Sequence, residues 1–209
     1  MANNQITKEA LATALKKLLE KQPLSKISVK HITDYCNISR NIFYYFQDKY
    51  ELINWVFYTD MLQNVNSFND PSKLTDSFLN VCKCLYANRK FYLACFQYVG
   101  QNSLYEYLND LYYEMWKINI DMRYSESGFK LTESELQLMA KMKAHSLVGI
   151  ISDWVKDGMR DNYMSYFEQV HAVLEFEASG YAHLTEERML GEHMEKANMI
   201  GRKKCLKVC

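Results

Sequence analysis

Three consecutive polar residues near the start of the chain carry groups that can hydrogen-bond to the edges of DNA bases. Ser39, Arg40 and Asn41 follow a short apolar segment and its turn. An arginine guanidinium pairs bidentately with guanine, and an asparagine amide does so with adenine. Such residues read sequence when they begin a helix that enters the major groove. The alternative for Arg40 and Asn41 is a solvated surface of a helical hairpin.

Five more side chains in this region have the chemistry of phosphate contacts, which position a protein on DNA without reading sequence. They are Ser28, Lys30, Tyr44, Tyr45 and Lys49. Residues 1–50 hold eight Lys or Arg against four Asp or Glu, although the formal net charge of the whole chain is zero. This local excess of positive charge is compatible with a polyanionic partner. We therefore expect double-stranded DNA to bind this segment.

The elements that position these side chains are predicted by caps and apolar spacing. A first helix is expected over residues 7–21 with Thr7 as its N-cap. Its apolar stripe consists of Leu11, Ala14, Leu15, Leu18 and Leu19.

The next two helices are short and closely linked. Ser28 is expected to cap the second helix, and Asn37 to end it in a left-handed conformation. Ser39 is then the next candidate cap, so a turn of about three residues joins the pair. The residues expected to hold the two helices together are Ile32, Ile38, Ile42 and Phe43. This is the helix-turn-helix pattern.

A fourth helix is expected to begin at Asp48, with Glu51 completing a capping box. Its buried side would hold Leu52, Trp55, Val56 and Leu62. Four short helices in the first sixty residues predict a compact DNA-binding head.

The rest of the chain is also expected to be helical, because it is poor in glycine and proline. The predicted helices cover about 49–65, 73–88, 90–98, 102–124, 132–157 and 162–176, with loops at 66–72 and at 125–131. The fold class is therefore all-α, a three-helix head followed by a helical bundle. The domains are a helix-turn-helix domain at 1–50, a dimerisation and effector-binding domain at 51–180, and a poorly defined basic tail at 181–209.

The helix beginning at Thr132 has a predicted capping box with Glu135, and Gly158 is placed to end it. One apolar side holds Leu136, Ala140, Ala144, Leu147, Ile151 and Trp154, and a second holds Met139, Met142, Val148, Ile150 and Val155. One side would face the core. The other, with the 162–176 helix, would form a four-helix interface with a second subunit. A thick internal core is the alternative.

Aromatic residues are dense between Tyr86 and Trp116. They are Tyr86, Phe91, Tyr92, Phe96, Tyr98, Tyr105, Tyr107, Tyr112, Tyr113 and Trp116. An apolar lining with a few hydroxyl groups suits a small-molecule pocket. A stripe at helical spacing is more often core, so no pocket residue is assigned.

Other classes of function find no support in the sequence. No phosphate-binding glycine loop, metalloprotease motif or nucleophile elbow occurs, so we expect no catalytic residue, no metal site and no cofactor. The six cysteines follow no disulfide or zinc spacing, and His145 is expected to be a hydrogen-bonded core residue. With no signal peptide and no membrane span, the protein is expected to be cytoplasmic. A short helix over 185–199 and a solvated tail with Arg202, Lys203, Lys204 and Lys207 would complete the chain.

The stretch ISVKHITDYCNISRNIFYYFQDKYELINWVF resembles the N-terminal head of the TetR family of bacterial regulators. The matching features are Ser28, Ile32, Cys36, Asn37, Ile38-Ser39, the aromatic cluster from Phe43 to Phe46, Asp48-Lys49 and Leu52. Segments 86–114 and 147–159 look like the sensor domain of a TetR subgroup that includes the dihydroxyacetone kinase operon regulator. The resemblance implies a dimer that binds a palindromic operator.

One spacing departs from the family pattern. The step from Ser39 to Phe46 is seven residues, where the family usually has about eight. One missing residue rotates an unbroken α-helix by about 100°. The function predicted is a transcription regulator modulated by a small molecule or a protein partner. The alternative is a helical protein-interaction module whose DNA-binding head is impaired.

Overall fold

The computed structural model describes residues 2–64, 73–126, 128 and 130–176, and this part of the chain contains helices and no strand. The helices are α1 (Ala2–Leu19), η1 (Leu24–Lys26), α2 (Val29–Tyr35), η2 (Arg40–Tyr45), α3 (Lys49–Asn64), α4 (Leu74–Ala87), α5 (Arg89–Cys95), α6 (Leu104–Glu126) and α7 (Glu133–Lys156). Residues 163–176 are helical as well. The all-α prediction is confirmed. Among the described residues, no helix is both long and apolar enough to span a bilayer.

The chain divides into two units, residues 1–165 and residues 166–209. In the second unit, residues 166–176 are helical. The loop expected at 66–72, the helix expected at 185–199 and the basic tail lie outside the described residues.

The head is built around α1, which packs against α2 and α3. Its core contains Leu11, Leu15, Leu24, Ile27, Ile32, Phe43, Phe46 and Leu52, all buried. The predicted start of α1 at Thr7 is wrong, because the helix already begins at Ala2. Residues 2–6 contain no helix breaker, and the Gln5 amide donates to Glu9 Oε1 at 2.9 Å across the extra turn. Predicted caps mark where a helix can begin and do not forbid a longer one.

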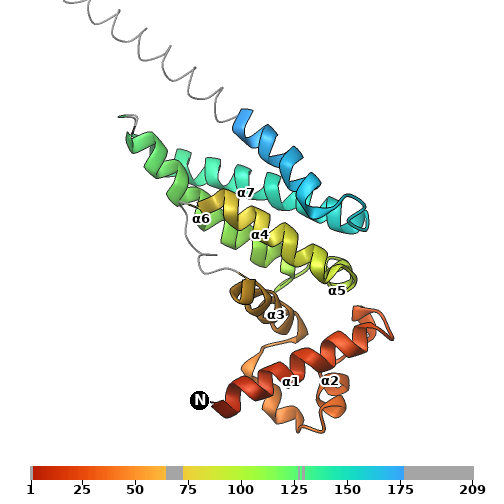
Figure 1. Ribbon diagram of the computed structural model, residues 1–209. Coiled ribbons are helices and arrows are strands. Elements are labelled where there is room, and N and C mark those ends of the chain that lie inside the picture. The colour runs from red at the N-terminus through yellow and green to blue at the C-terminus, as the bar shows by residue number, and fades with distance from the viewer. Residues whose placement is uncertain (1, 65–72, 127, 129, 177–209) are drawn as a thin grey trace, which may run out of the picture. The chain divides into compact units, whose positions relative to one another are not determined.

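The body holds the longer helices, and Figure 1 shows α4, α6 and α7 running side by side. The largest side chains that this core buries are Phe57, Phe78, Tyr92, Phe96 and Tyr112. Half of the dense aromatic segment is therefore packed core, as its helical spacing favoured. Phe91 and Trp116 are buried too, whereas Tyr86, Tyr98 and Tyr105 are half-exposed.

Helix α7 has the predicted ends. Thr132 Oγ1 accepts from the Glu135 N–H, Thr132 N–H donates to Glu135 Oε2 at 2.8 Å, and Gly158 follows the helix with φ of 84°. The first apolar side is buried throughout, as expected. The second side is divided. Val148 and Val155 are buried, while Met142 and Ile150 are exposed.

The histidine and the cysteines of the body differ in exposure. His145 is exposed, so its interpretation as a core histidine is wrong. Cys82, Cys84 and Cys95 are buried free thiols, and burial raises the pKa of each. For Cys84 the pKa rises to about 12. Such thiols stay protonated and unreactive at neutral pH.

Candidate nucleic-acid interface

The first helix of the predicted pair is α2, and its cap holds as expected. Ser28 Oγ accepts a hydrogen bond from the His31 N–H, and His31 Nδ1 accepts one from the Ser28 N–H. His31 thus takes the place that glutamate or glutamine occupies in the usual capping box. These reciprocal bonds fix where α2 begins and hold the Ser28 hydroxyl at the protein surface.

A tight turn joins α2 to the next element. Asn37 has φ of 53°, the left-handed conformation predicted for it. The N–H groups of Asn37 and Ile38 donate to the carbonyls of Asp34 and Thr33, at 3.1 and 3.0 Å. Asparagine tolerates this conformation better than other non-glycine residues, so the chain reverses here without glycine.

The second element of the pair is a six-residue 3₁₀-helix, η2. Ser39 stands at its N-cap position, but the Ser39 hydroxyl makes no capping hydrogen bond, which corrects the expected cap. The Ser39 carbonyl accepts from the Ile42 N–H at 2.9 Å, so the 3₁₀ hydrogen-bond pattern begins at Ser39. Ile42 is exposed, contrary to its predicted packing role, while Phe43 is buried.

The 3₁₀ winding offers a reason why the short step from Ser39 to Phe46 is tolerated. A 3₁₀-helix turns by about 120° per residue and an α-helix by about 100°, so a 3₁₀ segment reaches the same rotation with fewer residues. Ser39 and Phe46, on either side of η2, have extended backbone, so no unbroken α-helix carries the missing residue into α3. Phe46 is buried and its ring lies 6.0 Å from that of Trp55 on α3. The aromatic anchor therefore reaches the core despite the missing residue.

Most of the residues predicted to contact DNA are exposed on the head. Ser28, Lys30, Ser39, Arg40, Asn41 and Tyr44 are exposed, and Tyr45 is half-exposed. The Tyr44 ring is 73% exposed and lies 4.2 Å from the Tyr45 ring between centroids. Arg40 and Asn41 begin η2, where their side chains are free to reach a ligand. This arrangement can present hydrogen-bond donors to the edges of bases and to phosphates.

Lys49 differs from the other predicted contacts. Its ammonium donates to the carbonyls of Leu24 and Ile27, at 2.7 Å each. Its partial burial lowers its pKa. Two of its three donors are thus used inside the head, where they join the start of α3 to the segment before α2. Lys49 therefore has a structural role in the head.

One residue of the head that the sequence did not single out, Lys8, has a defined role, and the cap predicted at Asp48 is present. Lys8 Nζ lies 5.6 Å from the centroid of the Tyr45 ring and 5.5 Å from that of Phe46, so α1 supports the aromatic segment after η2. Asp48 Oδ1 accepts from the N–H groups of Tyr50 and Glu51 at the start of α3. The sequence shows no signal for Lys8, because its partners lie more than thirty residues away.

Two sets of hydrogen bonds among the described residues join the head to the body. In one, Lys16 Nζ lies 3.3 Å from Asp60 Oδ2, and the Tyr92 hydroxyl donates to the same oxygen at 2.9 Å. In the other, Asn102 Nδ2 donates to Asp48 Oδ2 at 3.0 Å. Tyr50 and Tyr98 also stack at this second joint, with ring centroids 3.7 Å apart.

Comparison with known proteins identifies the body of the chain. Residues 72–176 match the family model TetR_C_8, described as the C-terminal region of transcriptional regulators. The HTH-type dhaKLM operon transcriptional activator DhaS of Lactococcus lactis is 32% identical over 97 residues, which are 46% of this chain and 52% of that protein. The chain thus matches about half the length of this curated relative.

Solved structures show the same fold. The dihydroxyacetone kinase operon activator DhaS has a TM-score of 0.58 at 22% identity, covering 82% of this chain and 96% of that one. The fatty acid degradation regulator FadR from Bacillus halodurans has a TM-score of 0.53 at 17% identity, covering 80% and 93%. NalD, the secondary repressor of a multidrug efflux pump in Pseudomonas aeruginosa, has a TM-score of 0.52 at 16% identity, covering 79% and 93%. These relatives are transcription regulators. Because the family model matches half of the chain, this protein belongs to the TetR family of transcriptional regulators.

Proposed function

We propose that the protein binds a palindromic operator as a dimer and regulates transcription from it. The observation that carries this proposal is the exposed run Ser39, Arg40 and Asn41 at the start of η2, directly after the tight turn at Asn37. In this position Arg40 and Asn41 would read bases in the major groove. Such a regulator works where the chromosome lies, so we place it in the cytoplasm.

The remaining exposed residues of the head would contact the DNA backbone. Lys30 supplies a charge, and Ser28, Tyr44 and Tyr45 supply hydroxyl groups. Lys49 would act indirectly, because its two hydrogen bonds hold the start of α3 in place. Backbone contacts orient the recognition element, while specificity rests on Arg40 and Asn41.

Dimerisation is supported by the apolar residues that α7 leaves exposed. Leu138 and Met142, four residues apart, are 60% and 64% exposed, and Ile150 farther along α7 is 38% exposed. Large apolar side chains left exposed on a helix favour burial against a partner. The helical residues 163–176 also carry exposed apolar side chains, Val173 and Phe176. We propose that both helices join those of a second copy in a four-helix interface.

Fluorescence anisotropy with duplexes that tile the DNA upstream of the gene tests this function. We expect saturable binding to one tile, with Arg40→Ala and Asn41→Ala each lowering affinity for it by about tenfold, since a good base contact contributes about 1–3 kcal/mol. Lys83→Met, an exposed lysine of the body, is the matched control and should leave affinity unchanged. Equal affinity for all tiles, unaffected by either head variant, would contradict operator recognition.

The second candidate is a protein-interaction module with an impaired head. It is favoured by the seven-residue step between Ser39 and Phe46 and by the 3₁₀ form of η2. The salt dependence of DNA binding separates the two candidates, because affinity falls with a log–log slope of about −0.9 for each phosphate neutralised. A steep slope supports the regulator. Absence of DNA binding at low salt supports the interaction module.

A further inference from the structure

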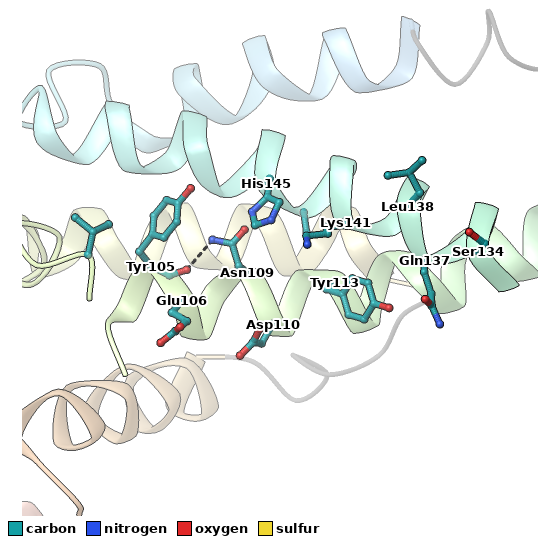
Figure 2. Close-up of a pocket in the computed structure, with 12 residues that line it drawn as sticks. Tyr105, Glu106, Asn109, Asp110, Tyr113, Ser134, Gln137, Leu138, Lys141 and His145 are labelled. Atoms are coloured by element: carbon teal, nitrogen blue, oxygen red, sulfur yellow. Dashed lines mark hydrogen bonds between the residues drawn. The ribbon is translucent and has the colours of Figure 1, made fainter. Parts of the chain in front are cut away.

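A groove of about 770 Å³ lies between α6 and α7, away from the residues proposed to contact DNA. Figure 2 shows its two walls, with Glu106, Asn109, Asp110 and Tyr113 on α6 and with Lys141 and His145 on α7. A volume of several hundred Å³ with a few convergent polar groups is typical of small-molecule sites. All of the lining residues belong to the first unit of the chain.

The two walls carry opposite charges that do not neutralise each other. Glu106 and Asp110 line the α6 wall, and Lys141 lines the α7 wall. Within the described residues, Asp110 and Lys141 form no ion pair. Farther along the same two helices Lys117 and Glu133 do pair, at 2.8 Å. In the groove, Glu106, Asp110 and Lys141 are exposed and form no ion pair among the described residues, so their charges are accessible to a ligand.

Between the walls lies a buried hydrogen-bond acceptor without a donor. Asn109 is 7% exposed, and its Nδ2 donates to the Tyr105 carbonyl at 2.9 Å. Its Oδ1 accepts no hydrogen bond from the described residues. Figure 2 shows this amide between α6 and α7, with the oxygen on the side of the exposed His145. A buried acceptor of this kind favours an N–H or O–H donor brought by a ligand.

We propose that the groove binds a small zwitterion and is the effector site of the regulator, an assignment that rests on the proposed function. The ligand's ammonium group would pair with Asp110 and Glu106 and donate to Asn109 Oδ1, and its anionic group would pair with Lys141 and His145. An amine without an acid group leaves Lys141 unpaired. A carboxylate without an amine gives Asn109 Oδ1 no donor.

The same wall is connected to the head. Glu106 Oε2 accepts from the Asn102 N–H at 2.7 Å and thereby holds Asn102, whose φ is 61°. Asn102 Nδ2 donates to Asp48, the residue that caps α3 immediately after η2 and its turn. A ligand ammonium that draws the Glu106 carboxylate into the groove weakens its hold on Asn102. The two heads then change their orientation, and operator affinity changes with it.

Isothermal titration calorimetry on the full chain tests the site. The probes are glycine, β-alanine, γ-aminobutyrate and lysine, with butylamine and butyrate as counterparts that carry one charge. We expect saturable binding of at least one zwitterion, and binding at least about tenfold weaker in Asp110→Asn and in Lys141→Met. Asp121→Asn, an exposed carboxylate of α6 outside the groove, is the control and should bind normally.

Three outcomes overturn the proposal. They are no saturable heat with any zwitterion up to about 10 mM, equal affinity for butylamine or butyrate, and binding that is unchanged in both groove variants. The effector role is read separately, from operator anisotropy of the unmodified chain with and without the zwitterion. A change in affinity of about fivefold or more supports that role. A bound zwitterion with no effect on operator affinity overturns it. Failure of the ligand-free chain to bind any operator contradicts the proposed function, while the calorimetry still reports on the groove.

Discussion

Lys30 and Lys49 both belong to the head, but the structure gives them different surroundings. Lys49 donates to two backbone carbonyls at 2.7 Å, whereas Lys30 is exposed. Lys49→Met leaves both carbonyls without their charged donor. It should lower the free energy of unfolding by about 2 kcal/mol, since two buried hydrogen bonds to a charged group would contribute about 3–6 kcal/mol and solvent screening reduces this for a half-exposed ammonium. Urea denaturation measures this loss.

Lys30→Met is the matched variant and should change stability by less than about 0.5 kcal/mol. It should instead reduce the salt dependence of DNA binding, by about one in the log–log slope. If the two variants behaved alike in both measurements, the structural role of Lys49 would be refuted.

The buried thiol of Cys84 makes stability depend on pH in the alkaline range. Burial raises its pKa to about 12 in the folded state, above the ordinary value of 9.0. An acid whose folded pKa is raised is favoured in its protonated form, so its contribution is complete below about pH 9 and declines as the unfolded chain ionises. Stability should fall between about pH 8 and pH 10, by on the order of 1 kcal/mol from this thiol. Urea denaturation at both pH values should show a smaller fall in Cys84→Ala.

At the scale of elements, the turn between α2 and η2 depends on Asn37. A left-handed conformation costs most L-residues about 1–2 kcal/mol, and asparagine and glycine much less. Asn37→Ala should therefore destabilise the protein by about 1 kcal/mol, while Asn37→Gly should be nearly neutral. Thermal denaturation of both variants compares them. An equal loss in the two would show that the side chain, and not its conformation, matters.

The 3₁₀ form of η2 makes a prediction about chain length. Inserting one alanine between Tyr44 and Tyr45 should rotate Phe46 away from its buried site by about 120° if the winding is kept. Loss of an aromatic core contact costs about 3 kcal/mol or more. Circular dichroism melts measure the loss. Undiminished stability would mean that the segment rewinds as an α-helix, and the compensation inferred for the short step would then be wrong.

The elements that the sequence predicts well obey local rules. The Ser28 cap, the left-handed Asn37 and the ends of α7 at Thr132 and Gly158 each follow from residues within a few positions. The features that it misses depend on distant partners. Lys49 donates to carbonyls more than twenty residues back, and Phe46, directly after η2, packs against Trp55 on α3.

For the candidate sites too, the features set by neighbouring residues could be predicted and those set by distant residues could not. Exposure of Arg40 and Asn41 could be predicted, because both are polar and begin an element whose buried side chain is Phe43. The groove between α6 and α7 could not be predicted, since its walls come from two helices about thirty residues apart in the chain. His145, assigned to the core by its place in an apolar helix, proves to be exposed there.

At the scale of the molecule, the joint formed by Lys16, Asp60 and Tyr92 connects α1 to the body. A double-mutant cycle with Lys16→Met and Tyr92→Phe should show a coupling of at least about 0.5 kcal/mol, because both side chains bond to the same carboxylate. Urea denaturation of the two single variants and the double variant measures it. If the losses in free energy of unfolding were additive, Lys16 and Tyr92 would contribute to stability independently of each other.

This joint also constrains the design of a chimaera with the DNA-binding head of another regulator. A chimaera that replaced residues 1–50 with the head of another regulator would keep Asp60 and Tyr92 but would lose Lys16. The partly buried Asp60 carboxylate would then lack its cation, unless the new first helix supplied one at the matching position. Specificity can therefore be transplanted most safely by grafting the few exposed residues of η2 and its turn, with the rest of the head left as the body requires.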